Sequence, residues 1–401
     1  MKIGILTYHQ SVNNGAVVQA YSLSKRIKND FPHADVKIID YRMPCVDEGY
    51  SYTLKSFYKG ATLRSFLGKS KLLLKDPDYL KRMRKRTEVF NSVLNVLPLT
   101  EKVINDNGTD ELVKYVNSNF DILIVGSDAI WNYVSRGFPS AYLPDKKVTV
   151  KKLSYAASCY GMDFFTRSDI EKTAIKEALN DFSFIGVRDD ATKDFVRWSE
   201  SGTQPFHTCD PTVFLDVNDL PIDENDLREK LRKRGFDFSR PSIGIMGTPQ
   251  MFNMIKSLYG SNYQIVALYN YIKGADVNLY DLTPYEWAYV FRFFKVSFTT
   301  FFHGTLLSLR NGTPVVCIEL ETEFAKKHTP KTLDVLTRLG FADWYFKTDY
   351  VSLNFDAIKK KADSFLENDY KNKILTAMDK EAESFIVFKK TLENIIRTME
   401  K

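Results

Sequence analysis

The chain has 401 residues, 44% of them hydrophobic and 26% charged, with 56 Lys and Arg against 50 Asp and Glu for a formal charge of +6. At roughly 150 residues per domain, this length predicts two or three domains and excludes a small binding module. No apolar run reaches the roughly 18 residues that cross a bilayer and no secretion signal opens the chain, so we expect a cytoplasmic protein.

The first residues alternate strands and helices. An apolar run over Lys2–Tyr8 predicts a strand, a polar loop follows to Gly15, and apolar residues at helical spacing then predict a helix. Val36–Asp40 predicts a second strand, so the chain opens with a β-α-β unit whose strands are parallel. Further strands are predicted at Asp121–Val125, Lys152–Ala156, Phe184–Val187 and in the stretch before Asp210.

Residues from about 45 to 118 predict basic helices inserted between the second and third strands. From Lys55 to Arg86, eleven Lys and Arg residues stand against two acids, a local charge of +9. No nucleic-acid-binding motif accompanies them, so nucleic acid is not an expected partner. Leucine and aromatic residues are interleaved with these charges, and two interpretations stay open. The stretch contacts an anionic membrane surface, or its apolar residues pack on the first domain and leave a solvated basic face.

A second alternating series follows Pro241. We therefore predict a linker over residues 216–240 between an N-terminal α/β domain, residues 1–215, and a C-terminal α/β domain, residues 241–370. The second series predicts strands at Ser242–Met246, Tyr263–Leu268, Val296–Thr299 and Val315–Ile318, and helices that begin near Thr283, Gly304 and Pro330. A C-terminal helix over residues 371–401 is expected to join the first domain. Two Rossmann-like parallel-sheet domains that face a cleft resemble a GT-B-like architecture, with the cleft as the expected site.

The four cysteines carry no metal or disulfide pattern. Cys45, Cys159, Cys209 and Cys317 lie far apart, and no CxxC pair occurs. We therefore expect reduced, mostly buried thiols and no metal site.

Polar residues at strand ends of the first domain are candidates for substrate binding. Asn14 and Gly15 precede a helix whose free amides suit an anion or a sugar hydroxyl, although a simple Asn-Gly turn is the alternative. Ser127, Asp128 and Trp131 follow the third strand at the same sheet edge. Asp128 is placed to hold or deprotonate a hydroxyl and Trp131 to stack on a sugar ring. A turn cap and a core tryptophan are the alternatives.

Arg188 closes the strand Phe184–Val187, and its planar fork suits a carboxylate or phosphate. The alternative is an ion pair with the neighbouring Asp189 and Asp190. Asp210 ends the next strand, where it either shapes a turn or points into the cleft.

The second domain contributes a histidine. An apolar strand delivers His303 to its carboxyl end, and Gly304 and Thr305 open a helix whose amide dipoles face the same space. This position suits a proton donor, and a structural histidine is the alternative. Lys331 lies near the next helix start, where an ammonium suits a phosphate.

The series TYHQSVNNGAVVQAYSLSKRI, VKIIDY, FDILIVGSDAIWN, LSYAAS, FIGVRDDAT, CDPTVFL and FFHGTLLSLRNGTPVV resembles the polysaccharide pyruvyl transferase family in order and spacing, over nearly the whole chain. The resemblance implies a GT-B-like fold and transfer of a pyruvyl group from phosphoenolpyruvate to two hydroxyls of one sugar, giving a cyclic ketal. Such enzymes modify surface polysaccharides or their precursors, so a sugar or glycan acceptor, free or lipid-linked, is implied as partner at the inner face of the membrane.

Carried over by residue, the resemblance places the family histidine at His303, the strand-end arginine at Arg188 and the N-terminal loop at Asn14 and Gly15. Some members have an arginine where this chain has Phe301, so another cation must bind the donor here. Arg188 and Lys331 are the candidates for the donor anions.

The expected reaction assigns acid and base work to His303, with Asp128 and Asn14 on the sugar, and needs neither a metal nor a cofactor besides the donor substrate. Two alternatives stay open. One is a GT-B glycosyltransferase that uses a nucleotide sugar and holds its ribose with Glu319, Glu321 or Glu323, and the other is a non-catalytic sugar-binding protein.

Overall fold

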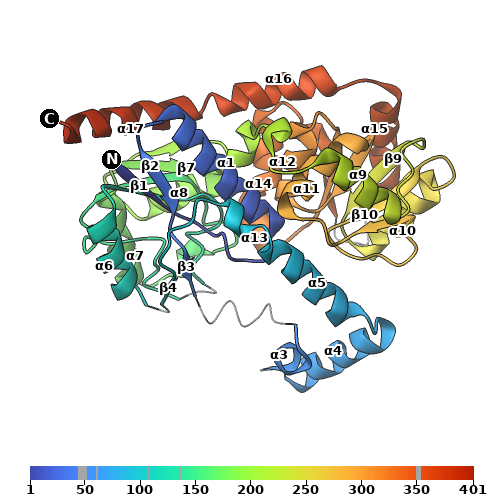
Figure 1. Ribbon diagram of the computed structural model, residues 1–401, viewed down its shortest axis with the longest axis horizontal. Helices are drawn as coiled ribbons and strands as arrows, with labels where there is room; N and C mark the ends of the chain where they lie inside the picture. The colour runs from blue at the N-terminus through green and yellow to red at the C-terminus, as the bar shows by residue number, and fades with distance from the viewer. Residues whose placement is uncertain (44–51, 60–61, 107, 135–136, 349–353) are drawn as a thin grey trace.

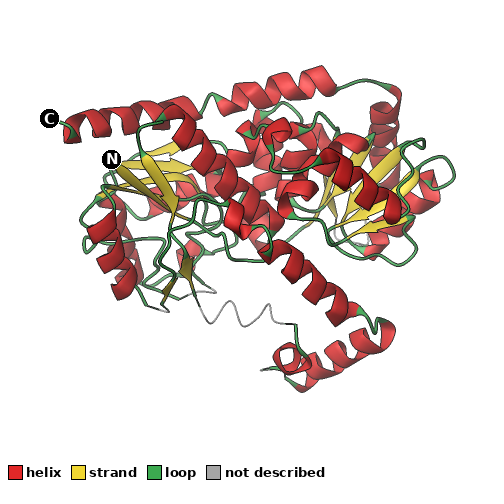
Figure 2. Ribbon diagram, viewed as in Figure 1, coloured by secondary structure: helices red, strands yellow, loops and turns green. Residues whose placement is uncertain are grey.

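The structure is a computed structural model that describes residues 1–43, 52–59, 62–106, 108–134, 137–348 and 354–401. Its strands gather in two groups, each surrounded by helices (Figure 2). Cys45 and parts of the predicted insertion lie outside the described residues. Within the described part, none of the helices combines the length and apolar character needed to span a membrane.

The first sheet has six parallel strands in the order β2-β1-β5-β6-β7-β8. Ile5 of β1 and Ile124 of β5 are fully buried, since helices cover both faces of the sheet. The strands are β1 (Lys2–Leu6), β2 (Asp35–Ile38), β5 (Ile122–Val125), β6 (Lys151–Ala157), β7 (Phe184–Val187) and β8 (Pro205–His207). A separate short pair joins β3 (Tyr41–Arg42) to β4 (Ile104–Asn105).

The second sheet also has six parallel strands, in the order β11-β10-β9-β12-β13-β14. Every residue of β9 and of β10 is buried, as expected for central strands of a doubly covered parallel sheet. The strands are β9 (Ser242–Met246), β10 (Gln264–Leu268), β11 (Val277–Leu279), β12 (Val296–Thr299), β13 (Val315–Leu320) and β14 (Tyr345–Thr348). Two parallel-sheet α/β domains are thus present, as predicted.

The described part of the chain has sixteen α-helices, most of which surround the two sheets. Those up to the second sheet are α1 (Asn14–Asp30), α3 (Leu54–Tyr58), α4 (Leu63–Lys75), α5 (Tyr79–Asn91), α6 (Asp110–Asn119), α7 (Asp169–Asn180), α8 (Asp190–Trp198) and α9 (Glu224–Lys233). The remainder are α10 (Pro249–Tyr259), α11 (Pro284–Tyr289), α12 (Phe302–Arg310), α13 (Glu323–Lys327), α14 (Lys331–Arg338), α15 (Phe355–Glu367), α16 (Lys371–Ala382) and α17 (Phe385–Met399).

The inserted helices form an arm. Figure 1 shows α3 and α4 standing away from both sheets, with α5 leading back to the body. The interval 216–240, predicted as a linker, contains α9, whose Leu227 and Leu231 are buried against the core. The domain boundary itself stays a prediction.

The prediction of one C-terminal helix is wrong in one respect, because the helix divides near Ser384. There the Ser384 hydroxyl accepts a hydrogen bond from the backbone of Cys209 at 2.9 Å. Helix α16 packs on α12, whereas α17 packs on the first sheet, with the Phe388 ring 4.8 Å from the Tyr155 ring. The C-terminal segment therefore spans both domains (Figure 1).

Candidate functional site

Charged side chains from both sheets converge where the carboxyl ends of their strands meet. Asp128, Arg188 and Asp210 follow β5, β7 and β8. His303 and Lys331 lie in the first turns of α12 and α14, after β12 and β13. This edge is where open parallel sheets bind ligands.

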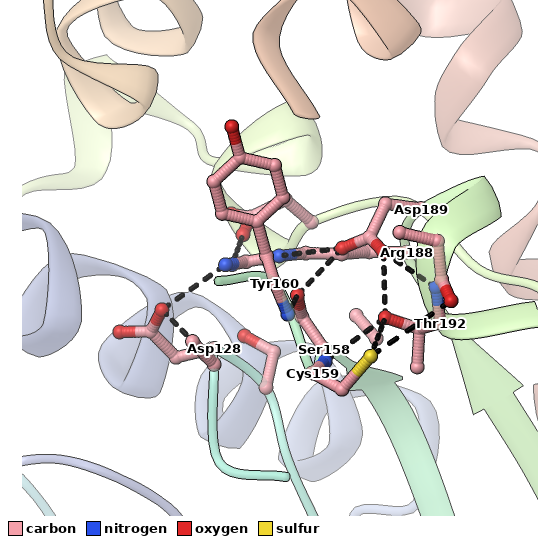
Figure 3. Close-up of polar contacts among 12 residues, drawn as sticks. Asp128, Ser158, Cys159, Tyr160, Arg188, Asp189 and Thr192 are labelled. Atoms are coloured by element: carbon pink, nitrogen blue, oxygen red, sulfur yellow. Dashed lines mark hydrogen bonds and ion pairs between the residues drawn. The ribbon is translucent and has the colours of Figure 1, made fainter. Parts of the chain in front are cut away.

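Arg188 is the centre of the cluster. Its side chain is 1% exposed, Nη1 donates to Asp210 Oδ2 at 2.8 Å, and Nη2 donates to Asp128 Oδ1 at 3.1 Å. Figure 3 shows Asp128 facing the guanidinium, with Asp189 on the opposite side, where Nε lies 3.9 Å from Asp189 Oδ2. Arg188 thus pairs with two distant acids and, at the longer distance, with its neighbour Asp189, while Asp190 pairs with Lys193. This guanidinium is occupied by protein carboxylates.

Asp189 is fixed by its own hydrogen bonds. Its carboxylate accepts bonds from the Thr192 backbone at 2.9 Å, the Thr192 hydroxyl at 2.5 Å and the Ser158 hydroxyl at 2.6 Å (Figure 3). These contacts make Asp189 the N-terminal cap of α8, so it holds β7 and α8 in place around Arg188.

The imidazole of His303 lies between Asp210 and the start of α1. His303 Nε2 is 3.6 Å from Asp210 Oδ2 and, among the described residues, has no hydrogen-bond partner. A Cβ atom on Gly15 would lie 2.2 Å from His303 Nδ1, so only glycine fits at this position. The two domains therefore touch through Gly15 and His303 at the site.

The two carboxylates are held in their charged form. Burial alone would raise the pKa of Asp210, but His303, Arg188 and the Thr212 hydroxyl together hold it well below its usual value. Burial opposes ionisation of Asp128 too, and electrostatic interactions with Arg188, His303 and Lys331 bring its pKa below the ordinary one. Both groups therefore act as fixed negative charges at neutral pH.

Lys331 differs from Arg188 in its surroundings. Its Nζ lies 5.1 Å from the ring centres of both Tyr160 and Phe302, and within the described residues no carboxylate lies at ion-pair distance from it. Burial and then the neighbouring Arg188 lower its pKa, which the carboxylates of Asp128 and Glu319 partly offset. An anion bound beside Lys331 would supply the missing partner.

Glu319 lies at the far side of Lys331. Its carboxylate accepts hydrogen bonds from the hydroxyls of Thr332 and, at 3.2 Å, Tyr345, and burial raises its pKa. Of the other two acids considered for a ribose, Glu321 lies 3.5 Å from Lys347 and Glu323 pairs with Lys326 at 2.6 Å.

Ser127 and Trp131 are placed in the core. Both side chains are fully buried: the Ser127 hydroxyl bonds to Gln19, and Trp131 Nε1 donates to the Tyr142 carbonyl at 3.0 Å. The expectation that Trp131 stacks on a sugar is not supported by this structure, because the indole is enclosed between the Phe182 and Phe195 rings. Core packing of the short loop after β5 explains both positions.

Asn14, Gly304 and Thr305 lie at the two helix starts. Asn14 is the first residue of α1 and is 4% exposed. Gly304 packs so closely on Met246 that a Cβ atom would lie 1.8 Å from Met246 Cε, and the buried Thr305 hydroxyl donates to the Phe301 carbonyl at 3.1 Å. These last two residues thus fix α12 against the sheet.

Two side chains of the site were not predicted from the sequence. The ring centre of Phe302 lies 4.8 Å from the Arg188 guanidinium carbon and 5.1 Å from Lys331 Nζ. Tyr160 leaves the loop after β6 and stands beside Arg188 (Figure 3), and burial raises its pKa to about 12. An aromatic residue in a loop gives no signal of such a contact in a single sequence.

The metal-binding residue types are scattered rather than clustered. Over the ranges that the structure describes, no group of three or more His, Cys, Asp or Glu is arranged to hold a metal ion. Cys159, Cys209 and Cys317 are free, buried thiols, and burial raises the pKa of each.

Comparison with protein families identifies a relationship over most of the chain. A family model described as "Polysaccharide pyruvyl transferase" matches residues 13–322, a range that holds Asp128, Arg188 and His303 and ends before Lys331. No curated protein matches the chain.

Solved structures share the arrangement of the two domains. The UDP-GlcNAc 2-epimerase from Methanocaldococcus jannaschii superposes with a TM-score of 0.55 at 12% identity, covering 97% of this chain and 99% of that one. The epimerase from Neisseria meningitidis bound to UDP-GlcNAc gives 0.53 at 10% identity, with 98% and 100% covered. UGT89C1 of Arabidopsis thaliana in complex with UDP gives 0.52 at 12% identity, with 100% and 99% covered. At such identities the likeness shows the fold alone, which is GT-B-like, as predicted.

Proposed function

Because the chain belongs to the polysaccharide pyruvyl transferase family, we propose that it moves the pyruvyl group of phosphoenolpyruvate onto two hydroxyls of one sugar. The observation that carries the proposal is the buried Lys331 ammonium, which has no ion-pair partner within the described residues and acts on Asp128 together with His303 of the His303–Asp210 pair. Together they offer a donor-anion site next to a proton carrier.

The reaction balances without a further reactant. One sugar hydroxyl adds to C2 of the enol and its proton ends on C3, which becomes a methyl group. The C2–O bond to phosphate then breaks, the second hydroxyl closes the ketal at C2, and its proton leaves with phosphate. Each step requires a group that takes up or delivers a proton and a cation near the departing phosphate.

His303 serves as that proton carrier. Its Nε2 has no hydrogen-bond partner within the described chain, and the Asp210 carboxylate 3.6 Å away stabilises the imidazolium that forms when Nε2 takes a proton. Asp210 is thereby a positioning residue for His303.

Lys331 binds the donor anions, since no carboxylate of the described residues pairs with its ammonium. Arg188, expected from the sequence to share this task, instead positions Asp128 and Asp210 through the two shorter of its three ion pairs. Asp128 and Asn14 are the proposed contacts to sugar hydroxyls, because both are at the edge between the domains.

The proposed acceptor is a surface polysaccharide or its lipid-linked precursor, met at the inner face of the cell membrane. The arm supports this location: Leu67 is 61% and Leu74 83% exposed on α4, a helix that also carries exposed Arg64, Lys71 and Lys75. Exposed leucines beside lysines suit an anionic headgroup layer. Membrane contact of the arm is part of the proposal.

Thermal unfolding of the protein in the presence of phosphoenolpyruvate or of UDP separates the candidate functions. Phosphoenolpyruvate is expected to raise the melting temperature, because a ligand that binds only the folded state stabilises it. A rise with UDP and none with phosphoenolpyruvate would instead favour a nucleotide-sugar transferase. No rise with either would favour a non-catalytic sugar-binding protein.

A further inference from the structure

A buried arginine on α5, apart from the cluster described above, lies against the residue that follows β10 of the second sheet. Arg86 is 6% exposed, and its guanidinium carbon is 3.4 Å from the centre of the Tyr269 ring. Tyr269 directly follows β10 and has a backbone φ of +69°, in the left-handed region that is costly for a side chain of this kind. The chain therefore holds the tyrosine in a strained position under the arginine.

Arg86 has no counter-charge within the described residues. Its Nη2 makes one long hydrogen bond, 3.4 Å, to the Val12 carbonyl, and its buried Nε has no partner. No carboxylate lies at ion-pair distance from it in the described chain. A buried charge of this kind is costly unless it is paired, so the site favours an anion.

The arginine opens into a cavity rather than into packed core. Arg86, Arg82, Tyr271 and Tyr280 are among the residues that line a cavity of about 240 Å³. Arg82, Tyr271 and Tyr280 also line an adjoining cavity of about 750 Å³, together with Lys81 and other basic residues of α5. The two cavities share three lining residues and so form one groove, in which basic side chains outnumber the carboxylates of Asp76, Asp78, Glu88 and Asp276 and the Tyr271 ring is exposed.

Two contacts connect the residues of this groove to the segments that carry the proposed active site. The Tyr269 ring lies 5.3 Å from the ring of Phe301, the residue that precedes α12 two positions before His303. The Val12 carbonyl, which accepts from Arg86, belongs to the loop that leads into Gly15. Arg86 thus stands at the border of the cleft in which Gly15 meets His303.

We propose that Arg86, with Tyr269 beneath it, binds the phosphate of a phosphorylated sugar acceptor, whose sugar rings lie along the tyrosines of the groove. The inference rests on the proposed function, in that it names the class of acceptor. A planar guanidinium with free N–H groups matches the oxygens of a phosphate. The donor is smaller and already has Lys331, whereas the extended groove suits a larger molecule with rings that stack on Tyr271 and Tyr280.

Calorimetric titration of the whole protein with glucose 1-phosphate, inorganic phosphate and methyl glucoside tests this proposal. The wild type is expected to bind glucose 1-phosphate more tightly than inorganic phosphate, with no binding of methyl glucoside. Arg86→Met is expected to weaken the binding of glucose 1-phosphate about tenfold or more, because a charge-assisted contact to the phosphate is lost. Arg86→Lys retains the charge and is expected to give an intermediate affinity. Arg64→Met, on the exposed surface of α4, is the matched control and should bind like the wild type.

A parallel titration with phosphoenolpyruvate separates this inference from the proposed function. The donor is expected to bind Arg86→Met within twofold of the wild type. Weaker donor binding with unchanged glucose 1-phosphate binding would assign Arg86 to the donor and overturn the inference while the proposed function stands. Wild-type protein that binds no sugar phosphate also overturns it, whatever the donor does. If Arg86→Met does not fold, Arg86→Lys serves as the test instead. Equal affinity of Arg86→Lys and the wild type for glucose 1-phosphate would then overturn the inference.

Discussion

Gly15, at the start of α1, lies against the imidazole of His303, at the start of α12, so closely that a Cβ atom on Gly15 would be 2.2 Å from His303 Nδ1. One residue belongs to the first α/β unit and the other to the second. The position of the proposed proton carrier therefore depends on the absence of a side chain in the opposite domain.

Gly15→Ala tests this contact. The added methyl group must displace the imidazole, so we expect turnover to fall roughly 10²-fold, the typical contribution of a positioned acid or base. Gly68→Ala is the matched control, because a Cβ atom at Gly68 meets nothing within 4 Å. It should retain full turnover and stabilise α4 by about 0.5–1 kcal/mol. Equal turnover of both variants would contradict the contact.

His303→Gln removes the proton carrier but keeps a side chain of similar size. We expect phosphate release to fall by roughly 10²-fold or more, while phosphoenolpyruvate binds with nearly unchanged affinity and the melting temperature shifts by only a few degrees. Steady-state kinetics and calorimetry measure the two effects separately. Turnover above about a tenth of wild type would remove His303 from the acid–base role.

Asp210→Asn reveals the stability that the Asp210 charge contributes. The pKa of Asp210 is depressed in the folded protein from its ordinary 3.8, so its contribution is fully present above that value and is lost as pH falls below it. Urea unfolding should show the variant less stable than wild type by a constant amount above about pH 5. The difference should narrow as pH falls below 3.8. A difference that does not change with pH would contradict a depressed pKa.

Lys331→Met should weaken the binding of phosphoenolpyruvate about tenfold or more, because it removes the ammonium proposed to contact the donor. The pKa of Lys331 lies below its ordinary 10.5, so wild-type affinity should begin to fall with rising pH before that value is reached. Lys327→Met is the matched control, since Lys327 is exposed and pairs with Asp163 at 2.6 Å. Equal donor affinity of the two variants would move the donor site elsewhere.

The arm makes a prediction about membranes. Replacing Arg64, Lys71 and Lys75 by Ser should abolish co-sedimentation with anionic vesicles at low salt, since each basic residue near the surface contributes about 1 kcal/mol. Arg82 and Arg86 are left unchanged, because Arg82 pairs with Asp76 and Arg86 is buried. A triple change on α15, Lys359, Lys360 and Lys361 to Ser, controls for net charge. Unchanged co-sedimentation of the α4 variant with anionic vesicles would contradict membrane contact through the arm.

The core of the fold follows from the sequence because central parallel strands are continuous apolar runs. Strands β7 and β9 have the bounds that were predicted, Phe184–Val187 and Ser242–Met246. Strands β11 and β14 were not predicted, since each is a short edge strand with exposed or half-buried positions. An edge strand of this kind lacks the apolar run that marks the centre of the sheet.

For the candidate site, the sequence predicts which residues lie at the carboxyl ends of strands, but not how their side chains contact one another. The position of Arg188 directly after β7 indicated that it lies at the carboxyl-end edge of the first sheet. Its partners Asp210 and Asp128 are 22 and 60 residues away in the sequence, so only the tertiary fold brings them together. Trp131 follows a strand at the same edge and is nevertheless core, because the loop after β5 turns the indole inward. Sequence position fixes which edge a residue reaches but not the direction of its side chain.

Proton and phosphorus-31 NMR of the protein mixed with phosphoenolpyruvate and a panel of glycan precursors is the most decisive test of the proposed reaction. For at least one acceptor we expect a new methyl singlet from the product and one equivalent of inorganic phosphate, both absent when His303→Gln replaces the wild type. Phosphate release without a ketal methyl signal, or a ketal formed equally well by His303→Gln, would contradict it.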